Sequence, residues 1–165
     1  MSVEYQFGLR FINGEVHFLL SDRKIVDWTV LHRVDVESSD LAVEMVRFCN
    51  RVKQETNGDS AVAVFLSEPD IQISEVSVAG HDKKQRENHV KRTLARRMSD
   101  VPENIEAEFG PVDQYNIAPT FYALKDTLLA ARQFIGRFGF QVAYFGAIDM
   151  PCGFVIAPRL QQPEK

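Results

Sequence analysis

The sequence predicts a mixed α/β (α+β) fold, because segments with strand and helix character follow one another along a single chain of 165 residues. Apolar residues make up 45% of the chain and charged residues 25%, which is the balance of an ordinary globular protein. The N-terminal third has the turn signals of a strand meander. Three later segments repeat their apolar residues at helical spacing.

The N-terminal segment predicts three strands. Residues 3–11 are rich in aromatic and β-branched side chains and lead into Asn13-Gly14, a dipeptide that accepts the positive φ angles of a tight hairpin turn. Residues 15–20 form the return strand, and a second turn over residues 21–24 leads into a third strand over residues 25–34. We therefore expect an antiparallel meander.

A helix and a fourth strand follow the meander. Ser38, Ser39 and Asp40 are candidate N-caps, and the apolar face that follows extends to the stop signal at Asn57-Gly58. Cys49 lies on this apolar face, so we expect a buried thiol rather than a nucleophile. Residues 61–66 form an apolar run of strand length, which is typical of a strand covered on both faces.

The remaining elements suggest an inserted unit and a return to the first sheet. We expect a strand over residues 71–78, a helix over 82–98, short strands over 105–109 and 120–124, a helix over 125–138 and a strand over 141–148. The chain then divides into residues 1–70 as the first part of one subdomain and 71–124 as a strand–helix–strand–strand insert. Residues 125–150 return to the first subdomain, and 151–165 form a tail.

Charge is distributed unevenly along the chain. Residues 1–80 carry 7 basic and 13 acidic groups, residues 81–98 carry 7 and 2, and residues 99–126 carry 1 and 6. The cationic helix between two acidic stretches is either a solvated face or a surface for an acidic protein partner or an anionic membrane. Its candidate partner-binding residues are Lys84, Lys91, Arg92, Arg96 and Arg97.

Several classes of function are not supported. The net charge is −4 and no aromatic or glycine-rich element lies among the basic residues, so we do not expect nucleic acid as a partner. Cys49 and Cys152 are far apart, and the four histidines lie on different elements, so we expect no disulfide, metal or cofactor. The N-terminus lacks a signal peptide and no apolar run could span a bilayer, which predicts a cytoplasmic protein.

The first five elements have the order of the first half of a ribonuclease-H-like sheet. A nuclease of this class needs several carboxylates on neighbouring strands to hold two divalent ions. The strand over residues 61–66 has none, and Glu68 and Asp70 flank a proline in a turn. A divergent nuclease is therefore the least favoured alternative.

The chain also resembles the first lobe of the actin-like ATPase superfamily, in the bacterial branch that includes the pilus-assembly protein PilM and the secretion protein GspL. The resemblance rests on Gly8-Leu9-Arg10-Phe11-Ile12, the run from Ala61 to Pro69, the 71–124 insert, Gly139 and a strand that ends at Asp149. The family places an aspartate and a second glycine where this chain has Arg10 and Ile12. We therefore expect no ATPase activity and no bound nucleotide.

The resemblance implies a non-catalytic protein-interaction module, a scaffold in pilus assembly or secretion. Its implied partner is a protein, the cytoplasmic segment of a membrane protein, which would place the chain at the inner face of the membrane. A homo-oligomer is left open. The competing hypothesis is a fragment of an actin-like nucleotide-binding ATPase, whose second lobe this chain does not include.

Overall fold

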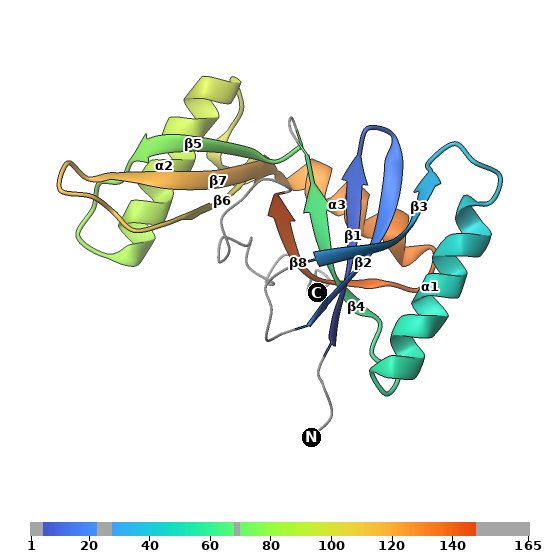
Figure 1. Ribbon diagram of the computed structural model, residues 1–165. Helices are drawn as coiled ribbons and strands as arrows, with labels where there is room; N and C mark the ends of the chain where they lie inside the picture. The colour runs from blue at the N-terminus through green and yellow to red at the C-terminus, as the bar shows by residue number, and fades with distance from the viewer. Residues whose placement is uncertain (1–4, 23–27, 68–69, 148–165) are drawn as a thin grey trace.

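The computed structural model describes residues 5–22, 28–67 and 70–147, which form two sheets and three α-helices (Figure 1). The larger sheet is built from both ends of the described chain. The smaller sheet is built from the segment between them, residues 72–124.

The larger sheet has five strands in the order β3-β2-β1-β4-β8. The meander β1 (Tyr5–Ile12), β2 (Glu15–Asp22) and β3 (Trp28–Asp35) is antiparallel, whereas β4 (Ala61–Leu66) is parallel to β1 and to β8 (Gln141–Ala147). Helix α1 (Leu41–Glu55) connects β3 to β4, and α3 (Lys125–Gly136) precedes β8. The elements therefore follow one another in the order that the sequence predicts, a three-stranded meander, a helix and a fourth strand, with a later helix and strand that return to the same sheet.

The smaller sheet has three antiparallel strands in the order β5-β7-β6. Strand β5 (Gln72–Ser77) is followed by α2 (Lys83–Met98), a short 3-10 turn η1 (Pro102–Asn104), β6 (Ile105–Phe109) and β7 (Ile117–Leu124). Helix α2 packs Val90, Leu94 and Ala95 onto one face of this sheet, against residues that include Val76, Ile105 and Ala118.

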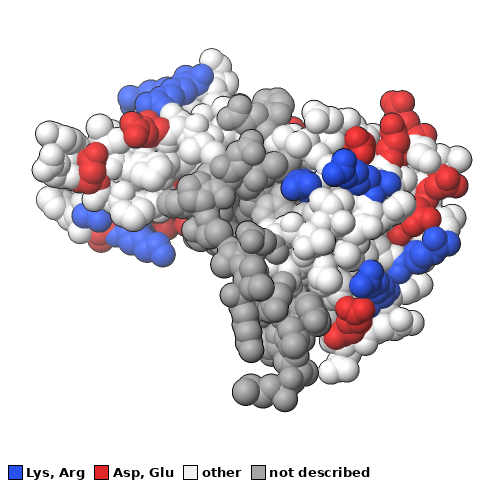
Figure 2. Space-filling model, in the orientation of Figure 1, with Lys and Arg blue, Asp and Glu red and all other residues white. Residues whose placement is uncertain are grey.

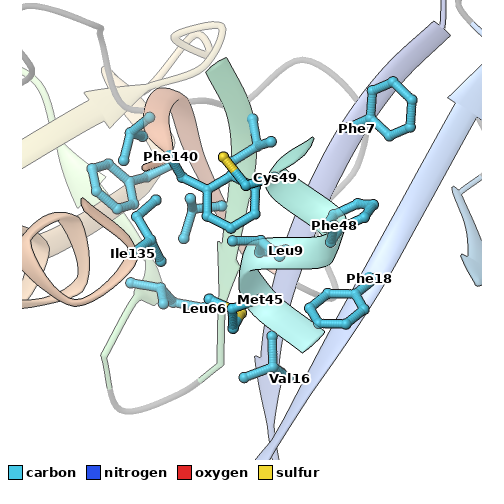
Figure 3. Packing of buried hydrophobic residues seen from close by; sticks show 14 of the residues in the cluster. Phe7, Leu9, Val16, Phe18, Met45, Phe48, Cys49, Leu66, Ile135 and Phe140 are labelled. Atoms are coloured by element: carbon cyan, nitrogen blue, oxygen red, sulfur yellow. The ribbon is translucent and has the colours of Figure 1, made fainter. Parts of the chain in front are cut away.

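The larger core lies between the five-stranded sheet and its helices (Figure 3). The Phe48 ring on α1 stacks on Phe18 at a centroid distance of 4.7 Å and meets Phe7 edge-on at 5.8 Å. Phe121 and Ala123 of β7 belong to this larger core. The two sheets therefore share buried residues, and the small one is anchored to the large one by β7.

The structure corrects two local expectations. Strand β7 begins at Ile117 and not at Thr120 as expected, so Ala118-Pro119 lies within the strand. Pro119 is tolerated because the adjacent strand β6 ends at Phe109, and the next residue, Gly110, donates its N–H to the Pro119 carbonyl at 2.8 Å. Asp40 stands at the N-cap of α1 without a side-chain capping bond. The expected tail, Cys152 and Asp149 lie outside the described residues.

Candidate partner-binding site

Helix α2 is the element that carries the predicted site, and its ends are well defined. The Asp82 carboxylate accepts a hydrogen bond from the Gln85 N–H at 2.8 Å, and the Gln85 side chain accepts one from the His81 N–H at 2.8 Å. These bonds satisfy donors at the start of the helix as a capping box does. Ser99 ends the helix in the left-handed conformation.

The five predicted residues lie on more than one face of α2. Arg92 and Arg96 are one helical turn apart on the side opposite the buried Val90–Leu94 seam. Lys84 and Lys91 lie on one flank, where Lys91 is half-buried. Arg97 lies on the other flank and donates a hydrogen bond to the Ser74 hydroxyl on β5 at 3.0 Å. The structure therefore places Arg92 and Arg96 on one side of the helix, Arg97 on the flank beside β5 and the two lysines on the opposite flank.

These cations do not pair with the acidic stretch after the helix. Within residues 5–22, 28–67 and 70–147, no ion pair joins a Lys or Arg of α2 to an acidic side chain. Glu106, in that acidic stretch, lies 3.6 Å from Lys125 instead. The helix is thus a cationic surface without a described ion pair, although Lys83 and Arg86 at its start line one pocket with Asp82, Glu87 and Glu108.

The charge of α2 contrasts with the rest of the molecule. The helix holds 7 basic residues and 1 acidic residue, whereas the remainder of the chain holds 12 and 22. In Figure 2, Lys and Arg side chains lie along the upper and lower margins of the small subdomain, and Asp and Glu side chains lie between them. An acidic ligand is attracted to this helix and repelled by most of the remaining surface.

The β1–β2 hairpin, where the family resemblance places a phosphate loop, is a tight turn. Asn13 and Gly14 both have positive φ angles, 53° and 75°, as a two-residue hairpin turn requires. At its base, the Arg10 guanidinium donates to His17 Nδ1 at 2.9 and 3.2 Å, and His17 Nε2 lies 3.7 Å from Glu15. The aspartate position of the family is therefore held by a cation that is engaged with a buried histidine.

Titration at this pair follows from its surroundings. Burial, and then the charges of Arg10 and Arg33, lower the pKa of His17 below its ordinary value, although Glu15 acts in the opposite direction.

No group of three or more metal-ligating side chains occurs within the part of the chain that the structure describes. Burial also raises the pKa of the Cys49 thiol, so this cysteine has the character of a core residue.

Sequence reasoning missed an apolar pocket of about 440 Å³ at the ends of β1 and β4, beside α3. Phe11 and Phe134 form part of its wall, with their rings 5.9 Å apart. Asp70 and Thr127 are the polar residues of a lining that includes no cationic side chain. Its residues come from separate segments, so no local motif could have indicated it.

Comparison with known proteins identifies the fold. No family model matches the chain, and no curated protein matches its sequence. Among solved structures, the cytoplasmic domain of EpsL, an inner-membrane component of the type II secretion system of Vibrio cholerae, has a TM-score of 0.61 at 14% identity and covers 86% of this chain. The PilM–PilN type IV pilus biogenesis complex contains a chain with a TM-score of 0.54 at 13% identity and the same coverage.

The chain shares the fold of these two proteins. It spans 56% of the EpsL chain and 47% of the chain from the PilM–PilN complex, which is about half of each. A third, weaker match has a TM-score of 0.41 and is described as a Bacteroides thetaiotaomicron protein with an actin-like ATPase fold. The PilM- and GspL-like fold expected from the sequence is confirmed. At these identities the likeness concerns the fold, so function is a separate question.

Among the described residues, no helix is both long and apolar enough to cross a membrane.

Proposed function

We propose that this chain is a non-catalytic protein-binding module that serves as a cytoplasmic scaffold in a pilus-assembly or secretion machine. Its partner is the cytoplasmic segment of a membrane protein, which holds the chain at the inner face of the membrane. The observation that carries this proposal is the concentration of basic residues on α2 in an otherwise acidic molecule. The fold shared with EpsL and with a chain of the PilM–PilN complex supports the biological setting.

The partner-binding surface is centred on Arg92, Arg96 and Arg97. Arg92 and Arg96 point away from the helix seam, and Arg97 extends the surface toward β5. Arginine side chains bind carboxylates with two parallel hydrogen bonds, so an acidic segment is the matching ligand. Lys84 and Lys91 lie to one side and contribute long-range attraction.

The test is a charge reversal measured against the native partner. The wild-type chain and the R92E/R96E/R97E variant are isolated from the native cells under identical conditions, and the retained proteins are identified by mass spectrometry. We expect the wild type to retain a membrane protein with a cytoplasmic segment, and the variant to retain at least about tenfold less, as loss of charged hydrogen bonds at an interface predicts.

The matched control is R47E/R51E/K53E, which reverses three exposed cations on α1. This variant should retain the partner at the wild-type level. The α2 variant should also melt within a few degrees of the wild type, because exposed charges contribute little and negative charge at a helix C-terminus costs about 0.3–1 kcal/mol per residue. Equal retention by the wild type and the α2 variant would contradict the proposed surface.

A further inference from the structure

Strand β5 forms an outer edge of the small sheet. It pairs with β7 on one side, and the strand order β5-β7-β6 places no other described strand beside it. Figure 1 shows β5 as an outer strand of the small sheet, with α2 across one face of that sheet. An edge strand presents unpaired backbone groups to which another extended chain can bind.

The register identifies these groups. The Val78 N–H donates to the Asn116 carbonyl at 2.7 Å, in line with the pairing of Ser77 with Ile117. In an antiparallel pair alternate residues direct both backbone groups to the partner strand. Residues 72, 74 and 76 therefore bond to β7, whereas Ile73, Glu75 and Ser77 direct their N–H and C=O groups outward. In the described part of the chain these groups have no backbone partner, and the Glu75 carbonyl accepts a hydrogen bond from the Ser74 hydroxyl at 3.4 Å.

The edge lacks three of the features that usually prevent strand addition, although it carries one charged side chain, Glu75. Natural edge strands are protected by lysine, proline or a β-bulge. Strand β5 has the sequence QISEVS, with neither lysine nor proline, and its register with β7 has no shift. Ile73 is 42% exposed. The strand is thus regular, partly apolar and open to a partner.

Helix α2 adds positive charge along this edge. Arg97 donates to Ser74 on β5 at 3.0 Å, and Arg86 Nε donates to the Gly80 carbonyl, beyond the end of β5, at 3.3 Å. The helix therefore runs antiparallel to β5. Arg86 and Arg97 are three turns apart on one flank, about 16 Å along the helix axis, which is close to the length of a six-residue strand.

We infer that the free edge of β5 and the Arg86–Arg97 flank of α2 together bind an acidic segment of a partner protein as an added strand. This inference rests on the proposed function and specifies how its partner binds. The backbone groups of Ile73, Glu75 and Ser77 hold the segment, as in other complexes formed by strand addition. Every second side chain of the segment then points to the α2 side, where a carboxylate meets Arg86 or Arg97.

The acidic residue of β5 does not oppose this arrangement. Val76 is buried in the core beneath α2, so its neighbour Glu75 lies on the other face of the sheet. The partner segment should accordingly have acidic residues at alternate positions on its α2 side. Its other positions should be β-branched or apolar, which suits the exposed Ile73.

The test combines peptide selection with amide hydrogen exchange. The whole chain is the bait for a displayed library of random dodecapeptides, and the peptide most enriched is synthesised. We expect an acidic peptide whose carboxylates alternate. By NMR it should slow exchange of the Ile73, Glu75 and Ser77 amides by about tenfold or more, because these become hydrogen-bonded, whereas the β7-bonded amides of Ser74 and Val76 change little.

Variants give an independent measurement. R86E/R97E should weaken binding of the selected peptide by about tenfold or more, while R47E/R51E on α1 should leave it unchanged. The exchange measurement uses the wild-type chain, so it decides the matter even if the double variant is poorly folded.

The contrary outcomes are distinct. Enrichment of no peptide, or of neutral or basic peptides only, overturns the inference. A peptide that depends on Arg92, Arg96 and Arg97 but protects none of the three β5 amides also overturns strand addition, and it leaves the proposed function intact. If exchange of the Ile73, Glu75 and Ser77 amides slows as the protein concentration rises, without any peptide, the edge binds a second copy of the chain. If phosphatidylglycerol vesicles slow this exchange, the edge binds a membrane. Either result overturns the inference.

Discussion

The pair formed by Arg10 and His17 shows how one residue changes the chemistry of a familiar site. Arginine is only a donor, so His17 Nδ1 must accept, and His17 must be neutral while both hydrogen bonds persist. The histidine is 7% exposed. A substitution that removed the Arg10 guanidinium would leave the buried His17 Nδ1 without this donor. The hairpin thus uses a cation for structural support at its base.

The lowered pKa of His17 predicts how the free energy of unfolding changes at acid pH. The pKa of His17 in the folded chain is lowered from 6.5, so the unfolded chain binds more protons as the pH falls below that value. Stability should be fully present above about pH 6.5 and should decline as the pH falls through the folded-state pKa. Urea unfolding at neutral pH and near pH 5 should show a larger loss for the wild type than for H17Q. An equal loss in both would contradict this assignment.

At Gly146, in β8 of the large sheet, the neighbouring Phe65 ring leaves no room for a side chain. A Cβ at this position would lie 2.9 Å from two ring atoms of Phe65, and that ring packs edge-on against Trp28 and Tyr144. G146A should therefore cost about 1–3 kcal/mol of unfolding free energy by overpacking. G136A is the matched control, because nothing lies within 4 Å of its added methyl at the end of α3, and it should be neutral or stabilising. Thermal unfolding of both variants measures the contrast.

At the scale of the element, the helices differ in how they begin. Asp82 caps α2 with its side chain, whereas Asp40 at the start of α1 makes no such bond. D82A should therefore cost about 1 kcal/mol of unfolding free energy, and D40A distinctly less. Denaturant unfolding of the two variants compares identical substitutions at equivalent positions. An equal or larger loss of unfolding free energy in D40A than in D82A would contradict this prediction.

The helices and strands were largely predictable because each has a local signal. Helices α1 and α2 and strand β4 begin and end close to the residues that their apolar patterns predict. The turn at Asn13-Gly14 also lies where the sequence predicts it. Strand β7 was predicted too short because Ala118-Pro119 resembles a turn locally. Its strand geometry is fixed by pairing with β5 and β6, which are distant in sequence.

The candidate site was predictable only in part. The clustering of charge on one helix is a sequence property. It predicted Lys84, Lys91, Arg92, Arg96 and Arg97 as binding residues, and their role in binding stays a prediction. Which flank faces β5 depends on tertiary packing, so Arg86 was not among the predicted site residues although it lies on the same flank as Arg97. The edge position of β5 and the pocket around Phe11 and Phe134 likewise result from the strand order, which no local pattern encodes.

At the scale of the whole molecule, the chain combines the fold that it shares with EpsL and a chain of the PilM–PilN complex with a polarised charge distribution. If nucleotide binding has been lost, Mg-ATP should not change the melting temperature. A ligand present at about a hundred times its Kd would stabilise by about 2.7 kcal/mol, which is several degrees for a chain of this size. Differential scanning fluorimetry with and without Mg-ATP measures this, and a rise of several degrees would favour the ATPase-fragment hypothesis.

The central claim is that a partner binds across the α2 side of the small subdomain. The most direct measurement is site-specific photo-crosslinking in the native cells, with benzoylphenylalanine in place of Arg92 on α2 and, as the matched control, in place of Arg51 on α1. Both positions are exposed on helices. We predict a crosslink from position 92 to an acidic cytoplasmic segment of a membrane protein, and none from position 51. A crosslink to that segment from position 51 and not from position 92 would contradict the account.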